Sequence, residues 1–542
     1  TEQVGVVLDS CYSGGGTRGN VRIRAADGGN IFQPSERELS FQADWISRLE
    51  ATGVLDRDSV LQQRGLGVAK GVVLAASQRD EPAAEVAFDG FEAGAFTYLL
   101  TQFLFQQADS VQSTVARIRP DMRQVADQLP VLEIQPERSF ETAPLYFVEA
   151  AEQVPPAEAV LTDGVDGTLW LGGVHPNAIA AYRQGTTLIP ASGGPPLVIT
   201  ERKGLIARVE SPLGLAANTP LRETARIIPG DLTLAIGLDP SLGADMIQAQ
   251  AHLDGLPMTT AVLPTVDGTY GTEIHYILGR MTPAYRAYFG DHPDLPPINA
   301  LGLFSQNLGD WVPGSFAAPT DSLRSALLDL GPRMISLLAV RMVTVSLNAQ
   351  ASPLGVSAQV VATTGDRVVA AARAGRGTTS ADRADLYTLK TNEPLQIRVT
   401  HAESVPLHVG VLGIFPSGNF KLLYPPNVSR QAAALPPGRA LRIPDPAVQS
   451  DLVIENPGLY EVGVLASPRP FNRALQNLDA VANSQRAGEV APDEDLSGFN
   501  GLFENLETPR QGEQAVVSQR LKADTFVALS LRFEVFGDRP MG

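Results

Sequence analysis

The chain has 542 residues, with 42 Lys or Arg against 59 Asp or Glu, so its formal net charge at pH 7 is −17. This charge argues against nucleic acid or an anionic membrane as a partner, because phosphate groups are bound by clustered cations. At roughly 150 residues per domain, the length predicts three or four domains. No apolar run reaches the ~18 residues of a membrane-spanning helix. The nearest, at 334–347, favours a helix that leads into a strand.

The first strand and the loop after it carry the strongest functional signal. Residues 4–8 are apolar or small, which predicts a strand buried on both faces of a parallel sheet. Asp9 and Cys11 follow this strand, where open α/β sheets carry their chemistry. Cys11 is the only cysteine, so it can form no intrachain disulfide. A single cysteine is also a poor candidate for a metal cluster, which needs several ligands. A small buried hydrophobe is the alternative interpretation of a lone cysteine.

The segment Asp9-Ser10-Cys11-Tyr12-Ser13-Gly14 resembles the nucleophile loop of the metacaspase-like, or orthocaspase, branch of the caspase superfamily. A second block at 72–100 is similar to the next strand and helix of bacterial caspase-family proteins: an apolar strand, then acidic residues including Glu85, then an apolar helix. The resemblance implies that residues 1–150 form part of an α/β caspase-like domain with a parallel sheet. It also implies that Cys11 is the nucleophile and that its backbone N–H contributes to the oxyanion hole.

The same resemblance gives roles to two acidic residues. Asp9 would form the floor of a pocket for a substrate Arg or Lys, and Glu85 is the second candidate for that pocket. Hydrogen bonding of Asp9 to its own turn is the competing interpretation. The six histidines all lie beyond the catalytic block, and none is assigned as the base: His175, His252, His275, His292, His401 and His408.

Members of this family carry the catalytic His upstream of the Cys. We therefore expect the chain to be the downstream part of a longer protein, with a Cys–His dyad completed by a preceding segment. The strand at 4–8 should then pair with the strand at 72–76 on one side only. Its other side should be open, or covered by its own upstream fragment as a separate chain. Residues 12–68 would be an insertion, in which Arg18, Arg22, Arg24 and Arg64 are candidate self-cleavage points.

The remaining pattern divides the chain by composition. Helices are expected at about 34–51, at 94–107 and at 111–129, the last broken by Pro120, followed by a strand near 130–134. Residues 151–350 read as mixed α/β with many strands and plain Asp-Gly turns that do not match a calcium-binding EF-hand loop. Residues 351–542 read as a β-rich, sandwich-like domain: a hairpin at 405–425, a strand at 459–465, a loop at 486–524 and a strand at 525–536.

The sequence thus favours a cysteine endopeptidase that cleaves after Arg or Lys, with protein or peptide substrates as partners. The alternative is a catalytically inactive caspase-like scaffold that binds partners through its C-terminal domains. An upstream His-Gly in the full reading frame would discriminate between the two. No cofactor and no metal are expected, and a calcium requirement is left open.

Overall fold

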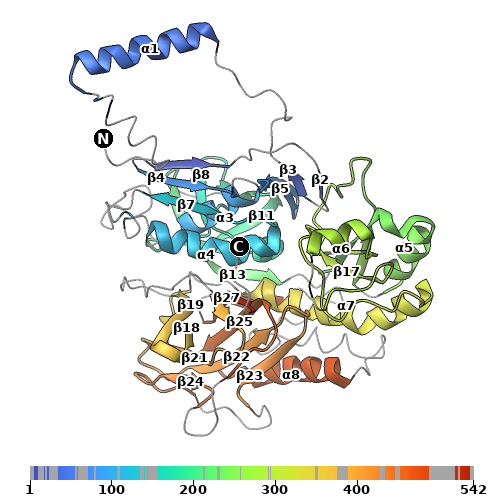
Figure 1. Ribbon diagram of the computed structural model, residues 1–542. Coiled ribbons are helices and arrows are strands. Elements are labelled where there is room, and N and C mark those ends of the chain that lie inside the picture. The colour runs from blue at the N-terminus through green and yellow to red at the C-terminus, as the bar shows by residue number, and fades with distance from the viewer. Residues whose placement is uncertain are drawn as a thin grey trace.

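The computed structural model describes residues 5–9, 17–18, 21–23, 35–54, 56, 58, 71–78, 81–106, 110–134, 140, 143, 156–210, 214–228, 232–256, 258–290, 292, 294–347, 352–374, 388–426, 434–445, 452–487, 519–522 and 525–537. Within these residues the chain is a mixed α/β protein with several sheets, some containing parallel strand pairs, and a β-rich C-terminal region (Figure 1). None of the described helices combines the length and the apolar character that crossing a membrane requires.

A three-stranded sheet carries the segment that leads to Asp9. Its strands are β1 (Gly5–Leu8), β4 (Val72–Ala75) and β7 (Val131–Ile134). β1 runs parallel to β4, and β7 runs antiparallel to β4 on its other side. β1 is therefore an edge strand in the described part of the chain, and its predicted pairing with a single neighbour is confirmed there.

The prediction that β1 is buried on both faces is wrong. Val7 packs against the core that β4 and β7 share with helices α3 (Ala95–Phe105) and α4 (Val111–Val125). Val6 and Leu8 point to the opposite face and remain 39% and 47% exposed. Alternation along a strand places successive side chains on opposite faces, and only the face toward α3 and α4 is buried.

Helix α4 runs through Pro120 without a break, which corrects the expected interruption. Proline removes one backbone hydrogen bond and crowds the preceding turn, at a cost of ~3 kcal/mol. Ile118 and Met122, on either side of it, are both 0% exposed. Fully burying two such side chains contributes ~3–6 kcal/mol, which is enough to offset the proline.

A small antiparallel sheet precedes α3 and also contains two strands of the predicted 12–68 insertion. Its order is β2 (Thr17–Arg18), β3 (Val21–Ile23), β5 (Ala84–Phe88) and β6 (Phe91–Gly94). Helix α1 (Glu36–Ala51) confirms the helix expected near 34–51 and has no buried residue. It lies apart from the rest of the molecule (Figure 1). Arg18 and Arg22 are strand residues, whereas Arg24 and Arg64 lie outside the described residues.

Six strands of the middle region close into an antiparallel barrel. Around the ring they are β8 (Ala159–Asp163), β9 (Thr168–Trp170), β12 (Ile206–Val209), β11 (Leu197–Lys203), β10 (Thr187–Pro190) and β13 (Thr219–Ile228). The ring closes because β13 pairs with both β8 and β10. Apolar side chains fill its interior, and Leu161, Leu169 and Leu188 are 0% exposed. A 3-10 helix, η4 (Pro176–Ala181), connects β9 to β10, and β26 (Gln519–Lys522) pairs with the end of β13.

A second unit of the middle region is a four-stranded α/β sheet. Its order is β15 (Thr259–Val262), β14 (Leu234–Leu238), β16 (Tyr276–Arg280) and β17 (Leu301–Ser305), and only β17 is antiparallel. The 3-10 helix η5 (Pro240–Asp245) and helices α5 (Met246–Asp254), α6 (Pro283–Phe289) and α7 (Leu323–Ser346) accompany it. The expected strand after residue 334 is wrong, because α7 remains helical to Ser346.

Two sheets packed on each other form the C-terminal region. One is β19 (Arg367–Ala374), β18 (Val356–Ala362), β21 (Leu395–His401) and β24 (Leu441–Ile443), with the 3-10 helix η6 (Thr364–Asp366) between β18 and β19. The other is β20 (Thr388–Lys390), β27 (Val527–Phe536), β25 (Gly458–Ser467), β22 (His408–Ile414) and β23 (Phe420–Tyr424). The predicted hairpin is β22–β23, and the two predicted strands are β25 and β27. Helix α8 (Asn472–Ala487) follows β25. The expected loop at 486–524 is wrong at both ends, because residues 486–487 belong to α8 and residues 519–522 form β26, which pairs with β13. Residues 488–518 and 523–524 lie outside the described residues.

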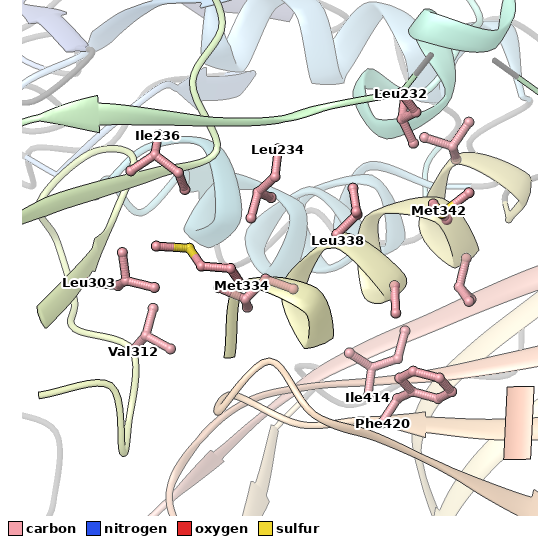
Figure 2. Close-up of a cluster of buried hydrophobic side chains, with 14 of the residues drawn as sticks. Leu232, Leu234, Ile236, Leu303, Val312, Met334, Leu338, Met342, Ile414 and Phe420 are labelled. Atoms are coloured by element: carbon pink, nitrogen blue, oxygen red, sulfur yellow. The ribbon is translucent and has the colours of Figure 1, made fainter. Parts of the chain in front are cut away.

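Helix α7 is the element that joins the α/β unit to the C-terminal sheets. Figure 2 shows Met334 and Leu338 of α7 between Leu234 on β14 and Ile414 on β22. All four belong to one buried cluster that also includes residues of α5 and α8. The α/β unit and the C-terminal region therefore share a hydrophobic core and do not pack as separate domains with polar surfaces between them.

Candidate active site

The carboxyl end of β1 leads directly to Asp9, whose partner is on another element. The hydroxyl of Thr97 donates a hydrogen bond of 2.5 Å to Asp9 Oδ2. Thr97 lies in the first turn of α3, which begins after Gly94 without a side-chain cap. A carboxylate at this end of a helix is favoured by the helix dipole. Asp9 therefore docks the end of β1 onto the start of α3.

The loop after β4 is held at the same end of the sheet. Gln128 donates from its side-chain nitrogen to the carbonyl of Ala76 and accepts from the N–H of Ala84, both at 2.8 Å. Glu81 accepts from the backbone N–H groups of Gln78 and Leu129, at 3.1 and 2.8 Å. These bonds satisfy backbone groups that would otherwise be costly to bury. Glu81 is thus used structurally, and Asp80 lies outside the described residues.

Glu85 follows β4, as expected from the sequence, and it lies on a further strand, β5. It is half-buried on β5 and faces Gly94 of β6 in the strand register. Gly94 is the residue that precedes α3, three positions before Thr97. Directly opposite residues on antiparallel strands are ~5 Å apart at Cα. The start of α3 is therefore next to both predicted pocket residues, through Thr97 for Asp9 and through Gly94 for Glu85.

Cys11 and Tyr12 lie outside the described residues, so the structure gives no geometry for the thiol or for its backbone N–H. The histidines are all described, and none is on the sheets that contain β1 and β5. They lie before η4, on α5, before β16, after α6, on β21 and on β22: His175, His252, His275, His292, His401 and His408. Within the described residues no group of three or more His, Cys, Asp or Glu is arranged to hold a metal ion.

The polar residues that sequence reasoning missed form a buried network beneath α4. Arg532 of β27 pairs with Asp121 of α4 and with Glu461 of β25, and its guanidinium lies 3.0 Å from His175 Nε2. Burial alone would raise the pKa of Asp121, but Arg532 and His175 outweigh burial and lower that pKa to about 2. The opposed charges of Asp121 and Glu461 likewise raise the pKa of Arg532, against the effect of its burial.

Comparison with known proteins identifies one part of the chain. Residues 388–470 match the model of a domain of unknown function, DUF4384. The match begins at β20 and ends just after β25, so it covers strands of both C-terminal sheets and none of the residues around Asp9. No curated protein and no solved structure matches the chain.

Proposed function

We propose that the chain carries the nucleophile and the basic-residue pocket of a caspase-like cysteine endopeptidase that hydrolyses peptide bonds after Arg or Lys. The observation that carries the proposal is the fixed carboxylate of Asp9. It is half-buried, it is held by Thr97, and it lies two residues before the only cysteine. A substrate guanidinium paired there would be partly shielded from water, which strengthens an ion pair.

The proposed reaction follows the usual course of thiol acyl transfer. The Cys11 thiolate adds to the substrate carbonyl, and the resulting oxyanion is stabilised by backbone N–H groups, that of Cys11 among them. The amine leaves with a proton from a histidine, and water then hydrolyses the thioester, which regenerates the thiol. The proposal assigns that histidine to a segment preceding residue 1, because none of the six histidines of this chain is on the sheets that contain β1 and β5.

An active-site probe tests the proposal in protein made from the full reading frame. An arginyl chloromethyl ketone should alkylate Cys11, whereas a probe with a neutral side chain should not, and mass spectrometry of the labelled peptides identifies the alkylated residue. Cys11→Ala should abolish labelling and hydrolysis. Equal labelling by both probes would contradict the pocket assignment.

The role of Asp9 has its own test. Asp9→Asn should lower kcat/KM for Arg and Lys peptides relative to neutral ones by an amount equivalent to ~2–5 kcal/mol, because a substrate cation loses its partner in a partly buried site. Asp163→Asn, at the exposed end of β8, is the matched control. An unchanged preference for basic peptides in Asp9→Asn would show that the carboxylate only docks α3.

The second candidate function is an inactive scaffold. The positions of the histidines favour it, because none of the six is on the sheet that contains β1. In that case the full-length protein would react with neither probe, and Cys11 would show the reactivity of an ordinary thiol.

A further inference from the structure

Four buried polar side chains meet where the barrel touches the end of α7. Glu158 precedes β8, Tyr182 follows η4, and Glu223 and Arg226 lie on β13; each is no more than 3% exposed. Arg226 donates two hydrogen bonds of 2.6 Å to the carboxylate of Glu223. The third nitrogen of its guanidinium donates to the carbonyls of Val345 and Leu347, at 2.9 and 3.0 Å.

Arg226 therefore clamps the C-terminal end of α7 to the barrel. The last carbonyls of a helix have no partner within the helix, and they carry the negative end of its dipole. A guanidinium is suited to this position because it is planar, always charged and rich in donors. Glu223 orients the guanidinium from the opposite side, so the contact depends on the state of the carboxylates behind it.

The cluster contains two carboxyl groups for one cation. Glu158 accepts the backbone N–H of Glu223 on Oε2 at 2.7 Å, and Tyr182 donates its hydroxyl to Glu223 at 2.5 Å. No donor among the described residues reaches Oε1 of Glu158, although this atom is buried. With both carboxylates ionised, the cluster would hold an uncompensated negative charge away from water, which is strongly unfavourable.

We propose that Glu158 holds a proton in the closed cluster, beside the ion pair of Glu223 with Arg226, and that this proton sets how tightly the barrel grips the end of α7. The groups that face Glu158 are Glu223 and Arg226 from β13 and Tyr182 from the segment after η4. Burial and the neighbouring Glu223 raise the pKa of Glu158 to about 7, although Arg226 acts in the opposite sense. The proposal is independent of any peptidase activity.

The sign of the effect follows from proton linkage. The closed cluster retains a proton up to about pH 7, whereas an opened Glu158 exposed to water ionises near its ordinary value of 4.5. Opening therefore releases a proton, and rising pH favours it by up to ~10-fold per unit between pH 5 and 7. Above pH 7 both states are ionised, and the dependence levels off.

Hydrogen exchange of the full chain at pH 5, 6, 7 and 8 tests the proposal. After division by the intrinsic exchange rate, opening of the last turn of α7 should increase roughly 10-fold per pH unit up to pH 7 and then stay constant. Glu158→Gln, which is neutral and of the same shape, should remove this increase. Glu201→Gln, at an exposed position of the same barrel, is the matched control and should keep it.

A second measurement does not depend on how well a variant folds. The infrared spectrum of the unmodified chain at pH 6 should contain the carbonyl band of a protonated carboxylic acid, which is lost as the pH is raised through 7 to 8. Absence of this band at pH 6 would overturn the proposal. An unchanged pH dependence of exchange in Glu158→Gln would overturn it as well.

Discussion

His175 lies buried between Asp121 and Arg532, and its two ring nitrogens have different partners. Nδ1 accepts the backbone N–H of Asn177 at 3.2 Å and so caps η4, while Nε2 lies 3.4 Å from Asp121 Oδ2. Burial lowers the pKa of His175 and outweighs the nearby carboxylate. A proton on Nδ1 would also replace the accepted hydrogen bond by a contact between two donors. His175 therefore stays neutral at pH 7.

This neutrality predicts a loss of stability in acid. The folded state binds its proton at lower pH than the unfolded state, whose imidazole titrates near 6.5, so unfolding becomes easier as the pH falls below about 6.5. His175→Asn keeps a cap acceptor but cannot titrate, and it should flatten the decrease in urea midpoint between pH 6.5 and 5. His292→Asn is the control, because the His292 imidazole accepts the same kind of local backbone hydrogen bond at a partly exposed site. An equal slope in His175→Asn and the unmodified chain would contradict the assignment.

Among the elements, α1 shows what local sequence can specify without tertiary contacts. Ser35 and Glu38 form a reciprocal capping box, as the side chain of each accepts from the backbone N–H of the other. Leu39, Phe41 and Trp45 are at least half exposed. The helix is therefore stabilised by its cap and its own residues, because packing supplies most helical stability only where an apolar face is buried.

Removing the cap should accordingly have a local effect. Ser35→Ala should destabilise α1 by ~1 kcal/mol, which would appear as ~5-fold faster hydrogen exchange in α1 alone, with an unchanged melting temperature for the whole chain. Ser40→Ala, on the same helix but away from the cap, is the control. A fall of several degrees in the melting temperature would instead show that α1 packs on the body of the protein.

Elements with a clear local sequence pattern are the ones that could be predicted. α1, α3 and the strands β25 and β27 follow from periodicity and turn residues near them in the sequence. The β5–β6 hairpin is not among the expected elements, although Asp89-Gly90 is a strong hairpin signal and Gly90 adopts φ +85° there. Pro120 predicts a break in the helix that the structure does not have. Whether a helix tolerates a proline depends on the burial of its neighbours, which the local sequence does not specify.

At the scale of the whole molecule, Arg532 joins segments that the sequence keeps far apart. It pairs with Asp121, which is 411 positions earlier, and contacts His175, which lies between β9 and β10 of the barrel. No local pattern points to such a partner, so the network could not be predicted. The position of Asp9, in contrast, could be predicted, because it directly follows an apolar strand in the sequence. Its hydrogen bond with Thr97 on α3 could not be predicted in this way.

The network predicts a large effect for a single substitution. Arg532→Met should lower the free energy of unfolding by ~3–5 kcal/mol, because two buried carboxylates, Asp121 and Glu461, lose their cation. Arg398→Met removes an arginine whose partner, Asp366, is 71% exposed, and it should cost no more than ~1 kcal/mol. Denaturant titration measures both. Equal losses in the two variants would show that the buried network is no more important than a surface pair.

The position of β27 has a consequence for how the protein is made. This strand lies between β20 and β25 in its sheet, yet it comes from residues 527–536, after every other described strand. On a translating ribosome, β20 and β25 emerge long before the strand that separates them. Until then Leu459 to Ala466 lack the partners that β27 supplies in register. A nascent chain stalled at residue 520 would thus present an apolar strand that is paired with β22 on one edge and open on the other, and such an edge is a site of chaperone binding and of aggregation.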